Sequence, residues 1–216
     1  MNVALRRMRE YGVVVVAIAF GTTLTVRAQN EGVKQVEQLI KKATAVQKSI
    51  DETKVELQKT MDAYNVVVAP ETTDRKSAYK KLNKQMESTQ EKRAEIPKQV
   101  DAMNVEADTL FKGWAESAKG ISDPDLKAQS QKRLTDAKAR LADIQADAAK
   151  AGSLYNTFMT ALQDRITFLG HDLNDTAVAK LKPGDAKLTA QATDLYAAVD
   201  KVSAALASDI QRLSPK

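Results

Sequence analysis

The fold of this chain is decided by residues 79–117, YKKLNKQMESTQEKRAEIPKQVDAMNVEADTLFKGWAES, where steps of three and four residues alternate along one mostly apolar line. A 3.5-residue repeat keeps one side of a helix turned toward a partner helix along its whole length, as in supercoiled bundles. We call such a line a seam. Its positions here are Tyr79, Leu82, Met86, Thr89, Arg93, Ile96, Val100, Met103, Ala107, Leu110, Trp114 and Ser117.

The same spacing recurs in residues 33–68 and 134–169, and apolar positions resume in residues 188–213. The first of these seams contains Val33, Val36, Ile40, Ala43, Gln47, Ile50, Lys54, Leu57, Met61, Tyr64 and Val68. Short links between long helices force neighbours to run antiparallel. The sequence therefore predicts an all-α fold, an elongated antiparallel coiled-coil bundle of about four long helices forming one domain over residues 29–216.

Turn and capping residues predict where these helices begin and end. The expected starts are near Asn30, at Thr72 or Thr73, at Asp123 followed by Pro124, and at Asn174 or Asp175, and the first three helices should end near Ala69, Lys119 and Asp172. Pro97 should kink the second helix, and Pro183-Gly184 should interrupt the fourth segment.

The N-terminus has the pattern of a secretory signal peptide. Arg6, Arg7 and Arg9 precede a short apolar core, and Val26 and Ala28 supply small residues before a cleavage site after Ala28. An uncleaved anchor is the alternative, but residues 11–26 are fewer than the roughly 20 needed to span a bilayer. We expect residues 1–28 to be removed, which places the protein in the periplasm or outside a bacterial cell with no stable membrane span.

Composition disfavours several classes of function. Removing residues 1–28 lowers Lys+Arg from 33 to 29 and Asp+Glu from 28 to 27, so the net charge falls from +5 to about +2. Acidic and basic residues alternate along every predicted helix, which indicates solvated faces and no nucleic-acid partner. The chain has no cysteine, a single histidine and none of the usual nucleophile, phosphate-loop or zinc motifs. We therefore predict a non-enzymatic protein without a cofactor or metal.

Polar residues should gather at one end of the bundle. Arg165 occupies a seam position, and a buried guanidinium needs carboxylates or carbonyls around it. Antiparallel pairing places it near Asp74, the partner we name first, with Asp172 second; His171 and Asn174 lie in the adjacent turn. This end is either a structural network or a site for a small anionic ligand or metal. Arg93, the second seam arginine, should face Asp147.

The opposite end has a different character, because the outer helices should stop short of the turn near residue 121. Leu110, Phe111 and Trp114 lie close to this tip and form a candidate partner-binding surface. The alternative is that Trp114 packs between two helices.

Residues 162–181, LQDRITFLGHDLNDTAVAKL, together with Phe111 and Trp114, resemble a family of secreted bacterial helical proteins known only as a domain of unknown function. The recurring positions are Arg165, Phe168, Leu169, His171, Leu173 and Asn174. The resemblance implies a bacterial envelope protein and assigns no activity.

Two functions of different classes follow. The first is an envelope scaffold, adaptor or holdase-like protein that binds another envelope protein. The alternative is a small-ligand or metal-sensing module at the Arg165/His171 end. An amphipathic bundle that opens onto a membrane is a third possibility.

Overall fold

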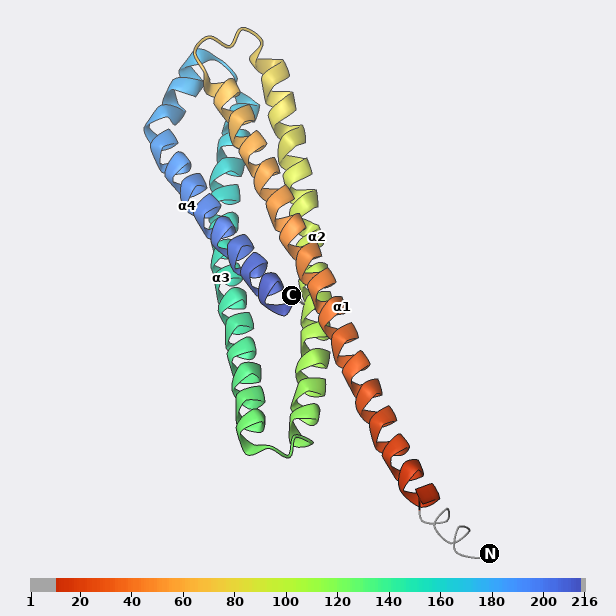
Figure 1. Cartoon of the computed structure of the whole chain (residues 1–216). Helices are drawn as coiled ribbons and strands as arrows, with labels where there is room; N and C mark the ends of the chain where they lie inside the picture. Colours follow the sequence, from red (N-terminus) through yellow and green to blue (C-terminus); the bar gives the residue numbers. More distant parts are fainter. Residues whose placement is uncertain (1–10, 215–216) are drawn as a thin grey trace, which may run out of the picture.

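The computed structural model describes the backbone of residues 11–214 and the side chains of residues 31–214. Four helices follow one another: α1 (Tyr11–Val68), α2 (Arg75–Lys119), α3 (Pro124–His171) and α4 (Asp175–Leu213). No strand occurs between residues 11 and 214. The prediction of an elongated, all-α, antiparallel bundle is confirmed (Figure 1).

The helices form a ring in which each packs against two neighbours. The contacts run α1–α2, α2–α3, α3–α4 and α4–α1; the α1–α2 interface is the most extensive and the α2–α3 interface the smallest. The C-terminal end of α4 lies well short of the α2–α3 turn (Figure 1). The tip of the α2–α3 hairpin therefore extends past α4, as the pairing of helices predicts.

Most predicted helix boundaries are correct to within two residues, but two need correction. The first helix begins at Tyr11 and not near Asn30, so residues 11–28 of the predicted signal peptide continue into α1; residues 1–10 lie outside the described part. The cap of α2 is Asp74, whose Oδ1 accepts from the Ser77 amide at 3.0 Å. Thr72 instead donates its hydroxyl proton to the Val66 carbonyl at 2.5 Å, and so satisfies the end of α1.

Both internal prolines lie within continuous helix. Pro97 is inside α2 and Pro183 is inside α4, so the predicted interruption at Pro183 is wrong. Each proline removes one backbone hydrogen bond. Both residues are exposed, so water can bond the carbonyl that each ring leaves free, and the cost to the helix is limited.

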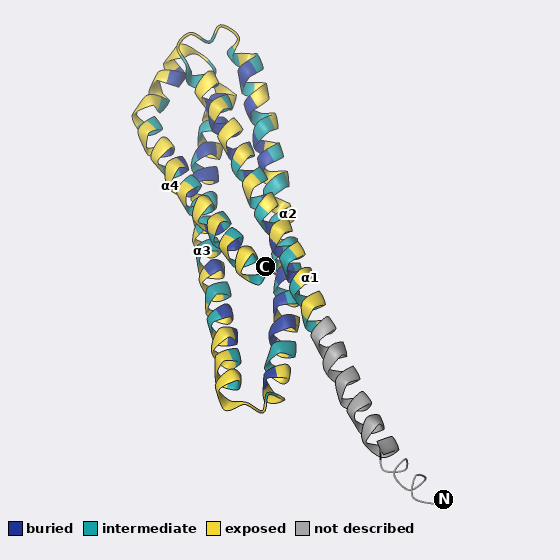
Figure 2. Ribbon diagram, in the orientation of Figure 1, coloured by how far each residue is buried: buried dark blue, intermediate teal, exposed yellow. Residues whose placement is uncertain are grey.

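The predicted seams match the buried faces of all four helices, and on α1 the buried face is wider than the predicted seam (Figure 2). On α2 every predicted position except Ser117 is at least half-buried. On α1 the buried heptad line also includes Leu39, Val46, Thr53, Thr60 and Val67. The predicted α1 positions from Val36 to Val68 are also at least half-buried, and Val33 is the one that is exposed. The buried face of α1 is wider than one seam because α1 packs extensively against both α2 and α4.

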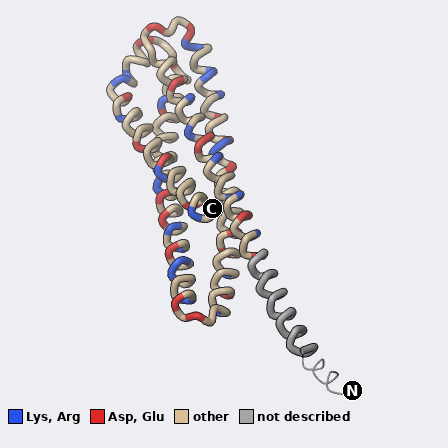
Figure 3. The backbone as a smooth tube through the Cα atoms, in the orientation of Figure 1, with Lys and Arg blue, Asp and Glu red and all other residues tan. Residues whose placement is uncertain are grey.

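The core is divided into two clusters along the bundle axis. One lies toward the α1–α2 and α3–α4 turns and includes the fully buried Tyr64, Leu82 and Phe158. The other lies toward the α2–α3 turn and includes Met103 and Leu206. Lys, Arg, Asp and Glu are distributed along all four helices without a one-sign face (Figure 3). This distribution agrees with the predicted solvated faces.

Candidate functional site

The polar end of the bundle is organised around Arg165, Asp185 and Tyr64. Arg165 donates through Nη1 to the Ala161 carbonyl at 3.1 Å and through Nη2 to the Gly184 carbonyl at 2.7 Å. Its Nε lies 4.0 Å from Asp185 Oδ1, which also accepts from the Tyr64 hydroxyl at 2.7 Å. Burial, and next the bond to Asp185, raises the pKa of Tyr64 well above its ordinary value, so Tyr64 stays a neutral donor.

The predicted partners of Arg165 were therefore wrong. Asp74 caps α2 and Asp172 accepts from Asn174, so neither carboxylate reaches the guanidinium. The partner is Asp185, which lies one residue past Gly184. A Cβ on Gly184 would lie 2.5 Å from Arg165 Nη2, so glycine is required for the guanidinium to approach the backbone of α4 this closely.

The other residues predicted for this end serve the helix termini. Asn174 caps α4 by accepting from the Ala177 amide at 2.9 Å. His171 is the exposed last residue of α3. Arg75 pairs with Asp175 and donates to the Val67 and Ala69 carbonyls, which ties the α1–α2 turn to α4. With its principal charges paired, this end has the character of a structural network.

The predicted tip residues pack inward. Leu110 and Phe111 are buried, and Trp114 is half-buried between α2 and α3. The Trp114 indole Nε1 donates to Ser130 Oγ at 2.9 Å, and Arg133 lies over its ring at 5.7 Å. Trp114 thus follows the alternative interpretation, and these residues do not present an open apolar surface.

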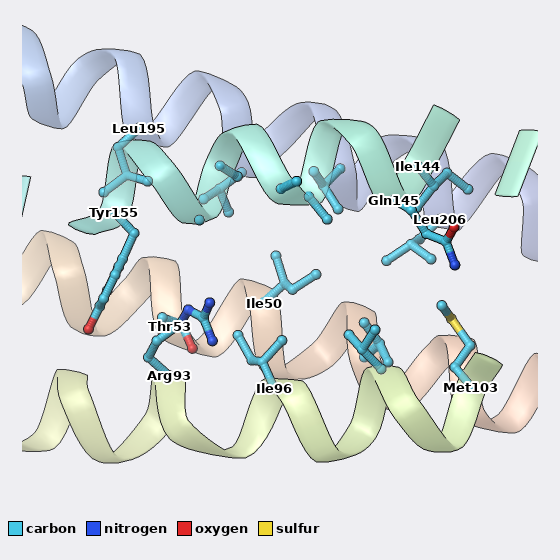
Figure 4. A pocket seen from close by; sticks show the side chains of 18 of the residues that line it. Ile50, Thr53, Arg93, Ile96, Met103, Ile144, Gln145, Tyr155, Leu195 and Leu206 are labelled. Carbon is cyan, nitrogen blue, oxygen red and sulfur yellow. The ribbon is translucent and has the colours of Figure 1, made fainter. Parts of the chain in front are cut away.

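A cavity of about 330 Å³ lies in the middle of the bundle, at the level where the two core clusters meet (Figure 4). We call it the central cavity. All four helices line it, through residues 46–57 of α1, 93–104 of α2, 144–155 of α3 and 195–206 of α4. Its walls are mainly aliphatic, and α3 contributes a run of small residues: Ala148, Ala149, Ala151 and Gly152. Packed protein cores rarely contain spaces much larger than a water molecule, so this volume requires an explanation.

Few polar groups reach the central cavity, and they are concentrated near its two ends. Arg93 and Tyr155 line one end with Thr53, and the Arg93 guanidinium lies 5.5 Å from the centre of the Tyr155 ring. Thr53 donates its hydroxyl proton to the Ser49 carbonyl at 2.8 Å. Burial raises the pKa of Tyr155, while the nearby Arg93 charge opposes that shift. Tyr155 is therefore a neutral wall of this end of the cavity.

Arg93 does not have the predicted partner. Asp147 pairs with Lys201 at 2.7 Å, and no carboxylate of the described residues lies within ion-pair distance of Arg93. A Cβ on Gly152 would sit 3.8 Å from Arg93 Nη2, so α3 leaves room beside the guanidinium. Among the described residues that line the cavity, the half-buried Arg93 is the only charged one.

The exposed residues of the cavity lining lie on α3. Gln145 and Ala149 of α3 are exposed, whereas every lining residue of α1 and α4 is buried or half-buried. Gln145 Nε2 donates to Asn104 Oδ1 at 3.0 Å, bridging α3 and α2 at this point. Because these two helices share the smallest interface of the ring, we locate the mouth of the cavity between them.

Two other kinds of site are not found in the described part of the chain. Residues 31–214 contain no cluster of three or more His, Asp or Glu side chains arranged to hold a metal ion. Within the described helices, no segment is long and apolar enough to cross a bilayer.

The comparison with known families agrees with the resemblance in residues 162–181. A model of the family described as "Protein of unknown function (DUF2959)" matches residues 27–212. The chain belongs to this family. No curated protein and no solved structure matched the chain. The family spans all the residues that line the central cavity and the network around Arg165.

Proposed function

We propose that this protein is a non-enzymatic binding protein of the bacterial envelope that holds an apolar ligand in the central cavity. The single observation behind the proposal is a space of about 330 Å³ walled by aliphatic side chains from all four helices. Ligand sites of helical bundles are commonly built between facing helices, and small-molecule pockets begin at about this volume.

The location in the envelope rests on the leader sequence. Residues 1–28 have the basic start, apolar core and small residues of a secretory signal. The family match begins at residue 27, adjacent to the expected cleavage after Ala28. Both features support export, and the structure describes no side chain of the leader.

Two earlier hypotheses receive less support. The exposed large apolar residues of the described part are spread over α1, α2 and α3 and include Val33, Val105, Leu126 and Phe168, a scatter that does not favour a scaffold or adaptor surface. A ligand site at the Arg165/His171 end is also less favoured, because Arg165 is already bonded to two carbonyls and faces Asp185.

The proposal is tested by ligand-induced stabilisation. Protein stripped of lipid on a hydrophobic resin should gain thermal stability when titrated with tetradecanol, since a ligand that binds the native state alone stabilises it. The variant Ala151→Leu, which fills part of the cavity, should lose this response. If the wild type gains no stability from tetradecanol or from any apolar or amphipathic molecule of similar length, the proposal is wrong.

A further inference from the structure

The shape of the central cavity restricts what it can hold. On each helix the lining spans 11 residue steps, which is about 17 Å at 1.5 Å of rise per residue. A space of about 330 Å³ drawn out over that length is elongated, a shape that suits an extended alkyl chain better than a compact fused-ring ligand.

The charge of the cavity restricts the ligand further. Arg93 lies at one end, and its N–H groups donate to no protein acceptor within residues 31–214. One face of the guanidinium is covered by the Tyr155 ring at 5.5 Å, which leaves its edge with a fork of donors unused. Such a fork matches the two oxygens of a carboxylate or phosphate group.

The two ends of the cavity differ in charge along the same axis. Arg93 and Tyr155 line the first end, while Met103, Ile144 and Leu206 line the other together with the uncharged Gln145 (Figure 4). Between them, Ile50 and Ile96 provide aliphatic walls (Figure 4). An amphiphile would therefore bind with its head group at Arg93 and its tail directed toward Met103.

We infer that the ligand is a single-chain amphiphile with one anionic head group, such as a long-chain fatty acid, bound with that group against Arg93. This inference rests on the proposed function, because it names the chemical class of the ligand of the same cavity. A carboxylate at Arg93 gives the guanidinium the counter-charge that the protein does not provide. The chain meanwhile replaces the empty volume by packed methylene groups.

The test compares amphiphiles of one chain length by calorimetry, below their critical micelle concentrations. Sodium myristate, tetradecanol, tetradecyl phosphate and tetradecyltrimethylammonium share the same alkyl chain and differ in the head group. We expect Arg93→Met to weaken myristate binding by about tenfold to a hundredfold, the range for a hydrogen bond to a charged group, with little change for tetradecanol. The cationic amphiphile should bind the wild type poorly and gain affinity in Arg93→Met.

Two variants control the experiment. Arg133→Met removes an arginine that also lies over an aromatic ring, Trp114, but outside the cavity, and should leave all affinities unchanged. Arg93→Lys keeps the charge and should retain part of the myristate affinity if Arg93→Met is poorly folded.

The outcomes separate the two proposals. If myristate and tetradecanol bind equally well and Arg93→Met affects neither, the cavity binds apolar ligands and the assignment of an anionic head group is overturned. If none of these molecules binds the wild type, the proposed function itself fails. Tighter binding of tetradecyl phosphate than of myristate would support the anionic class with a phosphate as its source. Tight binding of a two-chain phosphatidate would overturn the single-chain assignment.

Discussion

Replacing Ala151 by leucine should stabilise the ligand-free protein, although most large substitutions inside a helical bundle destabilise it. Ala151 is a half-buried seam residue of α3 that lines the central cavity. The leucine adds three carbon atoms, and at about 0.8 kcal/mol per buried methylene they contribute up to about 2.4 kcal/mol. Ordering the longer side chain costs about 0.5–1 kcal/mol, which leaves a net gain of about 1–2 kcal/mol.

The matched control is the same substitution at Ala192 of α4, which is 3% exposed and does not line the central cavity. There the extra carbons have no space to enter, so Ala192→Leu should cost about 1–3 kcal/mol. Helix propensity differs little between alanine and leucine, so the two variants isolate the effect of space.

The assay is chemical denaturation of lipid-stripped protein, followed by circular dichroism with each curve fitted for midpoint and slope. Opposite signs for the two variants are expected. If Ala151→Leu loses as much stability as Ala192→Leu, the central cavity closes in solution, and the argument from its volume fails.

Three further substitutions test the polar groups of the interior. Tyr196→Phe should gain about 1 kcal/mol at neutral pH, because the buried Tyr196 hydroxyl has no hydrogen-bond partner among the described residues. Burial, and next Asp62, raises the pKa of Tyr196 to about 12, so the wild type should lose stability as the pH rises from 10 toward 12, where the unfolded tyrosine ionises first. In urea melts over this pH range, the stability of the variant should fall less steeply. Asp185→Ala should cost about 1–3 kcal/mol, because it leaves the Tyr64 hydroxyl without its acceptor and removes the carboxylate that faces the half-buried Arg165 guanidinium. An unchanged melting temperature would contradict the network. Thr60→Val should destabilise the protein by about 1–3 kcal/mol, because it removes the hydrogen bond between the buried hydroxyls of Thr60 and Thr89, which lie 2.8 Å apart. In a double-mutant cycle, Thr60→Val combined with Thr89→Val should cost less than the sum of the two single changes.

The apolar repeat predicts the fold well because a buried seam needs no knowledge of which helix it meets. The α2 positions from Tyr79 to Trp114 are all at least half-buried, as a 3.5-residue repeat requires. On α1 the predicted positions from Val36 to Val68 are also at least half-buried, but two neighbours bury a wider face that includes a second line of residues. A single line of positions cannot show how many partners a helix has.

Side-chain partners were harder to predict than seams, because they depend on the register between helices. Pairing the helices by distance from their turns placed Arg93 opposite Asp147, whereas it lies against Tyr155, about two turns along α3. Asp185 was missed as the partner of Arg165, since we expected Pro183-Gly184 to break the helix that carries it. The relevant signal was Gly184 itself, a residue without a side chain where another group needs to approach the backbone.

The central cavity left a trace in the sequence that periodicity alone does not reveal. Ala148, Ala151 and Gly152 are small residues close together on α3, and the facing α2 seam carries Arg93 where an apolar residue is expected. Small seam residues can equally well draw two helices together, so the sequence did not distinguish close packing from empty space. The distinction depends on whether neighbouring layers hold the helices apart.

The two core clusters explain how the helices stay apart at this level. Buried residues such as Phe158 and Leu162 fill the layers beyond one end of the cavity, and Ala107 and Leu110 fill those beyond the other. Near the α3–α4 turn, the contacts of Arg165 with Gly184 and Asp185 fix the register of α3 against α4. The two helices therefore cannot close the central cavity by sliding along each other. A bundle packed at both levels can therefore keep an apolar channel open at its centre, at the cost of the stability that a ligand filling it would restore.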